Sequence, residues 1–257
     1  MCLKKEANGL VDLKEEYMVL NLSDGFINST QTNNEYTYTK GECYINKDVE
    51  CNVTALTYCF EIAGWTFPLE PGNFKQPEDR FAKFMIENEE VQNYYKVHFP
   101  AMYAEWDKGL RGCYTPLEVH KVLEFGINKW LGCSKADTFY ENYPIKEFLR
   151  QIYEKRLPIM TSGKFGILNH CVSIVGLRDF NQKDMENYLY CNGKNPEPTI
   201  IFDDPWYWFN INTKTYNKNS KGNDNTLSWK QFIEIVKPIG NNTVKYAHII
   251  QKPAATV

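Results

Sequence analysis

Cys51 is placed where a cysteine can act as a nucleophile. It follows a polar segment and opens a run of apolar residues at helical spacing, which Gly64 ends. This pattern predicts a helix that begins at or just after Cys51. The positive end of a helix favours the thiolate, which is the nucleophilic form of cysteine. The alternative interpretation is an inert cysteine buried in the core.

A nucleophilic thiol needs a base, and the sequence contains four histidines. His170 stands at the start of the β-branched segment 169–179, a predicted strand, and is our candidate base. His248 lies in the last predicted strand and is the alternative. His98 and His120 fall in predicted amphipathic helices, where surface or packing roles are the simpler interpretation.

The segment 198–204 runs an apolar strand into two carboxylates, and Pro205 follows. A carboxylate at a strand end can hold an imidazole in the required tautomer, so Asp204 is the third candidate. The alternative is that Asp-Pro only forms a turn. Trp206 begins a run of four aromatic residues, which either lines a substrate cleft or packs on the sheet.

Two kinds of element must position these residues. Apolar spacing predicts helices over 51–63, 77–97, 115–130 and 145–156, whereas the later residues favour antiparallel strands over 157–162, 169–179, 187–191, 198–204 and 244–251, with one helix at 227–236. The predicted fold class is α+β. We expect a single domain over 1–257, with a helical lobe at about 20–156 and a β-sheet lobe at about 157–252.

Composition excludes several classes of protein. The chain has 257 residues, 43% of them hydrophobic, which is enough for a substantial core. The net charge is −3 without a basic block, so no nucleic-acid partner is expected. No apolar stretch approaches the roughly 18 residues of a membrane span. The charged N-terminal segment does not resemble a secretory signal, which makes a cytoplasmic location the default and leaves a removed signal open.

The eight cysteines do not form a recognisable metal motif. There is no CxxC, and the even spacing of Cys43, Cys51 and Cys59 matches no ordinary zinc site. We therefore expect free thiols in a reducing compartment, no metal and no cofactor.

In the order cysteine, histidine, Asp-Pro, these segments resemble the papain-like cysteine peptidases, and more narrowly the peptidases related to bacteriocin-processing (double-glycine leader) peptidases. Cys51–Leu56 reads CNVTAL, similar to the CNVTSLAM of that family, and 169–176 reads NHCVSIVG, similar to GHIVVIVGY. The resemblance implies a papain-like fold in which Cys51 is the nucleophile, His170 the base and Asp204 the residue that orients it.

The same family carries a glutamine upstream of the cysteine, whose amide helps the cysteine N–H to stabilise the oxyanion. Gln31, in the sequence QTNN, resembles this motif, and Asn46, which lies closer to Cys51, is the alternative donor. Asn52, which follows the nucleophile where the family often has Gly, and Trp206 are the candidate substrate-binding residues.

The resemblance implies cleavage of a peptide or amide bond through an acyl-enzyme, with a peptide or peptidoglycan-like substrate. An acyl transferase (transpeptidase) would use the same three residues, because the cleft selects the acceptor. A catalytically inactive papain-like module that binds a peptide is a further alternative. A disulfide-stabilised structural protein is the fourth, and the charged N-terminus argues against it.

Overall fold

The structure is a computed structural model that describes residues 17–26, 30–40, 43–45, 50–69, 74–106, 116–165, 169–210, 213, 215–217, 222–236 and 242–254. The helices are α1 (Cys51–Ile62), α2 (Pro77–Glu87), α3 (Glu89–His98), α4 (Pro100–Trp106), α5 (Leu117–Trp130), α6 (Ile145–Tyr153), α7 (Gln182–Cys191) and α8 (Trp229–Val236), with a short 3-10 helix, η1 (Gln31–Asn33). The strands are β1 (Tyr17–Asn21), β2 (Tyr38–Lys40), β3 (Cys43–Ile45), β4 (Asp137–Pro144), β5 (Ile159–Gly163), β6 (His170–Asn181), β7 (Thr199–Asp203), β8 (Trp208–Asn210), β9 (Thr215–Asn217), β10 (Asn225–Leu227) and β11 (Thr243–Ile250).

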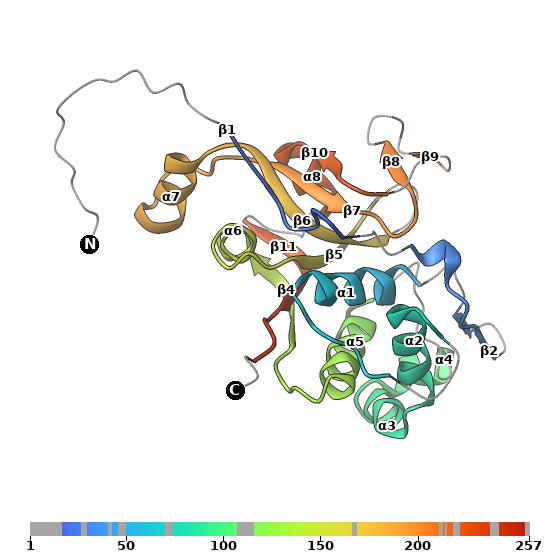
Figure 1. Cartoon of the computed structure of the whole chain (residues 1–257). Helices are drawn as coiled ribbons and strands as arrows, with labels where there is room; N and C mark the ends of the chain where they lie inside the picture. Colours follow the sequence, from blue (N-terminus) through green and yellow to red (C-terminus); the bar gives the residue numbers. More distant parts are fainter. Residues whose placement is uncertain are drawn as a thin grey trace, which may run out of the picture.

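Seven of the described strands form one antiparallel sheet in the order β10-β7-β6-β5-β11-β4, and β1 also pairs with β6. Helices α2 to α5 gather on one side of this sheet, and α1 lies between them and the sheet (Figure 1). The fold is therefore α+β, as predicted, with a helical region packed on an antiparallel sheet.

Strand β6 is buried on both faces for most of its length, because its alternate side chains enter different cores. Cys171 belongs to the core on the α1 side, whereas Val172 and Ile174 belong to the core on the other side. This explains why apolar residues stand next to one another in β6, as in Cys171-Val172 and Ile174-Val175, instead of alternating. It also places a strand that begins with His170 directly against α1.

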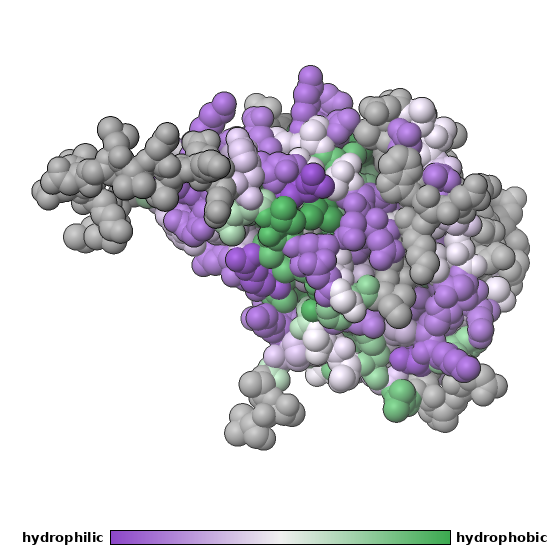
Figure 2. Space-filling model, turned by 45° about the horizontal axis from the view of Figure 1, so that its top comes forward, coloured by the Kyte–Doolittle hydropathy of each residue, from purple (hydrophilic) through white to green (hydrophobic). Residues whose placement is uncertain are grey.

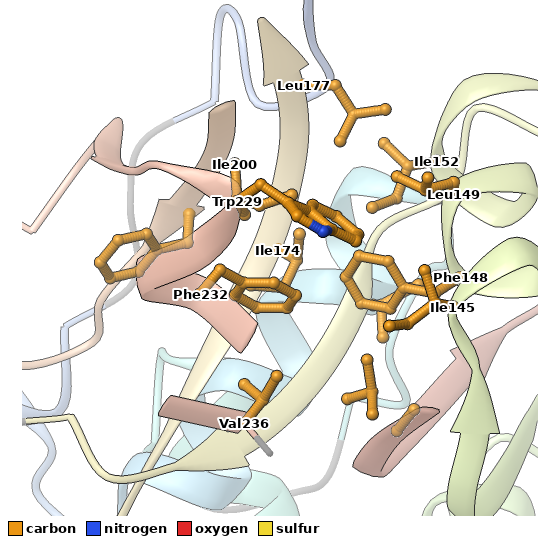
Figure 3. Packing of buried hydrophobic residues seen from close by; sticks show 14 of the residues in the cluster. Ile145, Phe148, Leu149, Ile152, Ile174, Leu177, Ile200, Trp229, Phe232 and Val236 are labelled. Atoms are coloured by element: carbon orange, nitrogen blue, oxygen red, sulfur yellow. The ribbon is translucent and has the colours of Figure 1, made fainter. Parts of the chain in front are cut away.

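The second core fills the space between the sheet and helices α6 and α8. Figure 3 shows Phe148 of α6 and Phe232 of α8 meeting over Ile174 of β6, and the two phenyl rings lie 5.4 Å apart. Both rings are fully buried, and burying such a side chain contributes roughly 1.5–3 kcal/mol. This core packs against the sheet whose strand ends carry His170 and Asp204.

The predicted elements differ from the observed ones at several places. Residues 187–191 were expected to be a strand but form the end of α7, so that prediction is wrong. The side chain of Asn181 caps this helix by accepting from the N–H groups of Lys183 and Asp184, and buried Met185 and Leu189 stand one helical turn apart.

The helix expected over 77–97 is two helices, because Asn88 ends α2 and caps α3 with its side chain. Strands β1, β4 and β10 were not predicted, although all three join the main sheet. The sheet therefore draws strands from both parts of the chain, and the boundary near residue 157 is not a boundary of the sheet.

The cysteines only partly follow the expectation of free thiols. None of Cys51, Cys59, Cys133 and Cys171 forms a disulfide. Cys191, at the end of α7, is disulfide-bonded, so the expectation is wrong at this position.

The surface in Figure 2 is mostly hydrophilic, with a smaller group of hydrophobic side chains near the middle of this face. Within the described ranges, none of the helices has the length and apolar character needed to cross a bilayer.

Candidate active site

Cys51 is the first residue of α1, as the sequence predicts. The preceding residue, Glu50, accepts a backbone hydrogen bond from Thr54 N at 3.0 Å. The side-chain Nδ2 of Asn34 donates to Glu50 Oε2 at 2.5 Å and to Thr54 Oγ1 at 3.1 Å. These contacts tie the segment after η1 to the first turn of α1 and fix the position of the thiol.

His170 is the first residue of β6, and Asp204 directly follows β7, the neighbouring strand. The pairing brings the two side chains together, so that His170 Nε2 and Asp204 Oδ1 lie 2.8 Å apart. Both residues are buried, at 5% and 0% exposure. With Nε2 engaged by the carboxylate, Nδ1 is the ring nitrogen left for the thiol.

The backbone around Asp204 is held closely. Asp204 N donates to Gly222 O at 2.8 Å, and Trp206 N donates to Asp204 Oδ1 at 2.8 Å. A Cβ atom at Gly222 would lie 2.0 Å from Asp204 O, so this close approach requires glycine. The carboxylate is therefore positioned before any substrate binds.

The side chains of Cys51 and His170 interact, and each changes the pKa of the other. Burial lowers the pKa of His170, but the Asp204 carboxylate and Cys51 raise it to about 10. Burial raises the pKa of the Cys51 thiol well above its usual value, as does contact with Cys171, and His170 lowers it. The pKa values of the thiol and the imidazole therefore depend on each other. We call Cys51, His170 and Asp204 the cysteine array.

Gln31 lies close to this array although it is distant in sequence. Its backbone N donates to Pro205 O at 2.9 Å, and Thr30 Oγ1 donates to the same oxygen at 3.0 Å. The Gln31 side chain is 1% exposed, and neither of its amide atoms has a hydrogen-bond partner among the described residues. Such buried amides are rare, and one on a segment bonded to the residue after Asp204 is suited to receiving a polar atom of a ligand.

Asn52 is also buried, and its Oδ1 accepts from Val53 N at 2.8 Å. Its Nδ2 has no partner within the described part of the chain. Asn46, the alternative oxyanion donor, lies outside the described residues.

Aromatic side chains cover the His170–Asp204 pair. The Trp206 ring lies 6.3 Å from the His170 ring, edge to face, and stacks on Tyr216 at 5.9 Å. The Tyr216 ring lies 6.0 Å from the His170 ring. Burial and the nearby Asp204 and Cys51 raise the pKa of Tyr216. These rings keep water from the histidine–carboxylate hydrogen bond, which strengthens it.

Sequence reasoning missed Tyr216. It belongs to the short strand β9 in a polar segment without a hydrophobic period, so only its position in space identifies it. Within the described residues no group of three or more His, Cys, Asp or Glu side chains could hold a metal ion.

Comparisons with known proteins add little to this geometry. No protein-family model matches the chain, and a search of curated proteins finds no match. Among solved structures, the chain is similar to one titled "Crystal structure of UfSP from C.elegans", with a TM-score of 0.29 and 14% identity. The similarity covers 68% of this chain but only 31% of the other, so the chain matches less than a third of that protein's length. Membership of the family related to bacteriocin-processing peptidases stays a prediction from motifs.

Proposed function

We propose that the protein is a papain-like cysteine peptidase or amidase that cleaves a peptide or amide bond through an acyl-enzyme. The observation that carries this proposal is the cysteine array. A cysteine at a helix N-terminus interacts with a buried histidine, and that histidine is bonded to a buried carboxylate at 2.8 Å. This is the nucleophile, base and orienting group that acyl transfer requires.

In the proposed reaction His170 takes the thiol proton, and the Cys51 sulfur attacks the carbonyl carbon of the scissile bond. The Asp204 carboxylate stabilises the imidazolium and fixes its orientation. His170 then gives the proton to the leaving amine as the C–N bond breaks, and water hydrolyses the thioester. A peptide or peptidoglycan-like substrate fits this chemistry.

Gln31 is the proposed oxyanion donor, together with the N–H of Cys51. Its support is the unpartnered buried amide on a turn that is bonded to Pro205, the residue after Asp204. A donor aimed at the developing oxyanion is worth roughly 10²–10³ in rate. Asn52, with an unpartnered Nδ2, and Trp206 are proposed to contact the substrate.

The test is labelling of the native protein with iodoacetamide from pH 5 to 9, with each cysteine followed separately by peptide mass mapping. We expect Cys51 to react fastest at low pH in the wild type, because His170 accepts its proton, and to lose this advantage in His170→Ala. His98→Ala is the matched control, since His98 lies at the exposed end of α3. Partly buried Cys133 is the internal reference.

Two results would contradict the proposal. If Cys51 titrates like an ordinary thiol near pH 8.5 in the wild type, or reacts equally in the wild type and in His170→Ala, the two side chains are not a catalytic pair. The peptide-binding module would then be the better assignment. If the pair is demonstrated, screening with peptides and muropeptides identifies the substrate, and added amine acceptors distinguish a transferase from a hydrolase.

A further inference from the structure

A second chain of hydrogen bonds, separate from the cysteine array, ends at a serine. Asp137 Oδ2 of β4 lies 2.5 Å from His248 Nδ1 of β11. His248 Nε2 lies 3.0 Å from Nδ1 of His120 on α5, and His120 Nε2 lies 3.1 Å from Ser162 Oγ of β5. We call these four residues the serine array.

The serine array allows one consistent placement of its protons. If Asp137 is a carboxylate, His248 donates its Nδ1–H to it and accepts at Nε2 from the Nδ1–H of His120. His120 Nε2 is then an acceptor and takes the hydroxyl hydrogen of Ser162. The pKa of His120 is lowered well below its usual value by burial, and by His248 and Lys245, which keeps this ring neutral and leaves Nε2 able to accept a hydrogen bond.

The position of Asp137 is fixed by its backbone. Asp137 N donates to Asn128 Oδ1 at 2.8 Å, and Asn128 Nδ2 donates to Asp137 O at 2.9 Å. The ring of Phe139 stacks on the His120 ring at 5.0 Å with the planes 2° apart. Asp137, His120 and His248 are fully buried, so the rings are held in one orientation.

Ser162 is 7% exposed and lines a cavity of 340 Å³. Lys164, Asn169, Glu234 and Lys245 also line this cavity, together with the apolar side chains of Ile235 and Val236. None of Cys51, His170, Asp204 and Gln31 lines it. The reactive end of the serine array therefore opens into a space of its own.

We propose that Ser162 is a second nucleophile, activated by His120, which takes a short acyl group from a carboxylic ester. A serine hydroxyl bonded to a base that is itself oriented by further groups is the arrangement used for acyl transfer. The two lysine ammonium groups of the cavity supply positive charge for a developing oxyanion. A cavity of this volume is at the small end of ligand sites, which limits the acyl group to a short one.

The proposed reaction has two stages, acylation of Ser162 and hydrolysis of the acyl-serine. The Ser162 Oγ–H proton moves to His120 Nε2 while Oγ forms a bond to the carbonyl carbon. The carbon–oxygen bond to the leaving alcohol breaks, and that oxygen receives the proton from His120. Water then hydrolyses the acyl-serine ester, releases the carboxylic acid and restores the hydroxyl. His248 and Asp137 are positioning residues, which spread the charge that forms on His120.

The test uses the full chain carrying Cys51→Ala, because thiols also react with esters. It is treated with a fluorophosphonate, whose phosphorus forms a bond to Ser162 Oγ as fluoride leaves, and the adduct is located by peptide mass mapping. Hydrolysis of p-nitrophenyl acetate is measured in parallel. We expect labelling at Ser162 and a loss of both signals, by about 10²-fold or more, when Ser162→Ala is added. Ser134→Ala, at an exposed serine, is the control.

Asp137→Asn tests the positioning role. An asparagine amide in this place donates to His248 Nδ1 and reverses the chain, so that His120 presents N–H to Ser162 and cannot accept its proton. With folding verified by circular dichroism, we expect a labelling rate that rises continuously with pH, in place of the plateau expected above the lowered pKa of His120. The charged and titratable groups that face the array are Glu124, Lys245 and Cys59.

Two results would overturn the proposal. The first is folded Cys51→Ala protein without a Ser162 adduct, with ester hydrolysis equal to that of the Cys51→Ala/Ser162→Ala double variant. The second is an unchanged pH profile in Asp137→Asn. Neither result bears on the cysteine array, because that array is tested independently by iodoacetamide labelling of Cys51.

Discussion

The cysteine array and the serine array are built from the same kinds of group but distribute charge differently. In the cysteine array one carboxylate contacts the only histidine, and the pKa of His170 rises to about 10. In the serine array the carboxylate contacts His248, and His120 lies one ring further away with a pKa well below its usual value. The distance from the carboxylate thus decides whether the reactive histidine is charged or neutral at rest.

This difference matches the two proposed nucleophiles. A thiol can lose its proton to a histidine in the ground state, so a charged histidine suits cysteine. A serine hydroxyl keeps its proton until it attacks, and therefore needs a neutral base.

The largest expected effect is that each array loses its own activity when its nucleophile is removed, while the other array keeps its activity. Cys51→Ala should lower amide hydrolysis by at least about 10³-fold and leave Ser162 labelling within about twofold. Ser162→Ala should do the reverse. Turnover of a cleaved peptide or muropeptide and fluorophosphonate labelling are measured on the same preparations. If either substitution abolishes both signals in folded protein, the arrays are one site and the comparison fails.

The unpartnered amide next to the cysteine array gives the second prediction. Gln31→Ala should lower kcat for amide hydrolysis by about 10²–10³-fold, because the oxyanion loses a donor. Alkylation of Cys51 by iodoacetamide forms no oxyanion and should stay within about twofold. Asn33→Ala, at an exposed residue of the same 3-10 helix, is the control. Equal losses in turnover and alkylation would mean that Gln31 acts on the thiol instead.

The opposite pKa shifts predict opposite effects of pH on stability. The raised pKa of His170 contributes stability that is complete below about pH 6.5 and is lost as the pH rises through about 10. The lowered pKa of His120 contributes stability that is present above about pH 6.5 and is lost as the pH falls below it. Each pKa unit corresponds to about 1.4 kcal/mol.

The measurement is the free energy of unfolding in urea from pH 5 to 10. We expect His170→Gln to flatten the alkaline side of the profile and His120→Gln to flatten the acidic side, whereas His98→Gln changes neither. A flattening on the same side in both variants would show that the two histidines do not differ in charge.

The smallest expected effect concerns Cys171, which shares a core with Cys51 and raises the pKa of its thiol. Cys171→Ala should therefore speed the alkylation of Cys51 a few-fold below pH 8. Cys133→Ala is the matched control. The rate of iodoacetamide labelling at Cys51 is the readout, and a slower rate in Cys171→Ala would show that Cys171 supports the thiolate instead.

The sequence predicted the cysteine array better than the serine array, for a physical reason. Cys51, His170 and Asp204 each stand at the end of a helix or strand, where local patterns are readable. His120, Ser162 and His248 lie within elements and look like ordinary core or packing residues, and Asp137 begins a strand that the sequence did not predict. His120 in particular was expected at the surface or in packing, and it is fully buried in a polar network.

The same limit explains the errors in the fold. Strand β4 reads DTFYENYP, without a clear alternation, and forms because β11 pairs with it along most of its length. Residues 187–191 are aromatic enough to favour a strand, but the cap at Asn181 and the stripe of Met185 and Leu189 select a helix. Tertiary pairing and helix capping determine the secondary structure of these segments. Neither produces a local hydrophobic period in the sequence.

The pairing of β5 with β6 has a consequence for how this scaffold tolerates change. Ser162 lies opposite Cys171 and Gly163 opposite His170, so neighbouring positions of one strand pair serve both arrays. Substitutions in the surrounding loops can alter the surroundings of either array independently. Insertion or deletion of one residue within Ile159–Gly163 or His170–Asn181 would exchange the faces of the strand and disable both nucleophiles together. Libraries made from this chain should therefore vary residues within these two strands but preserve their length.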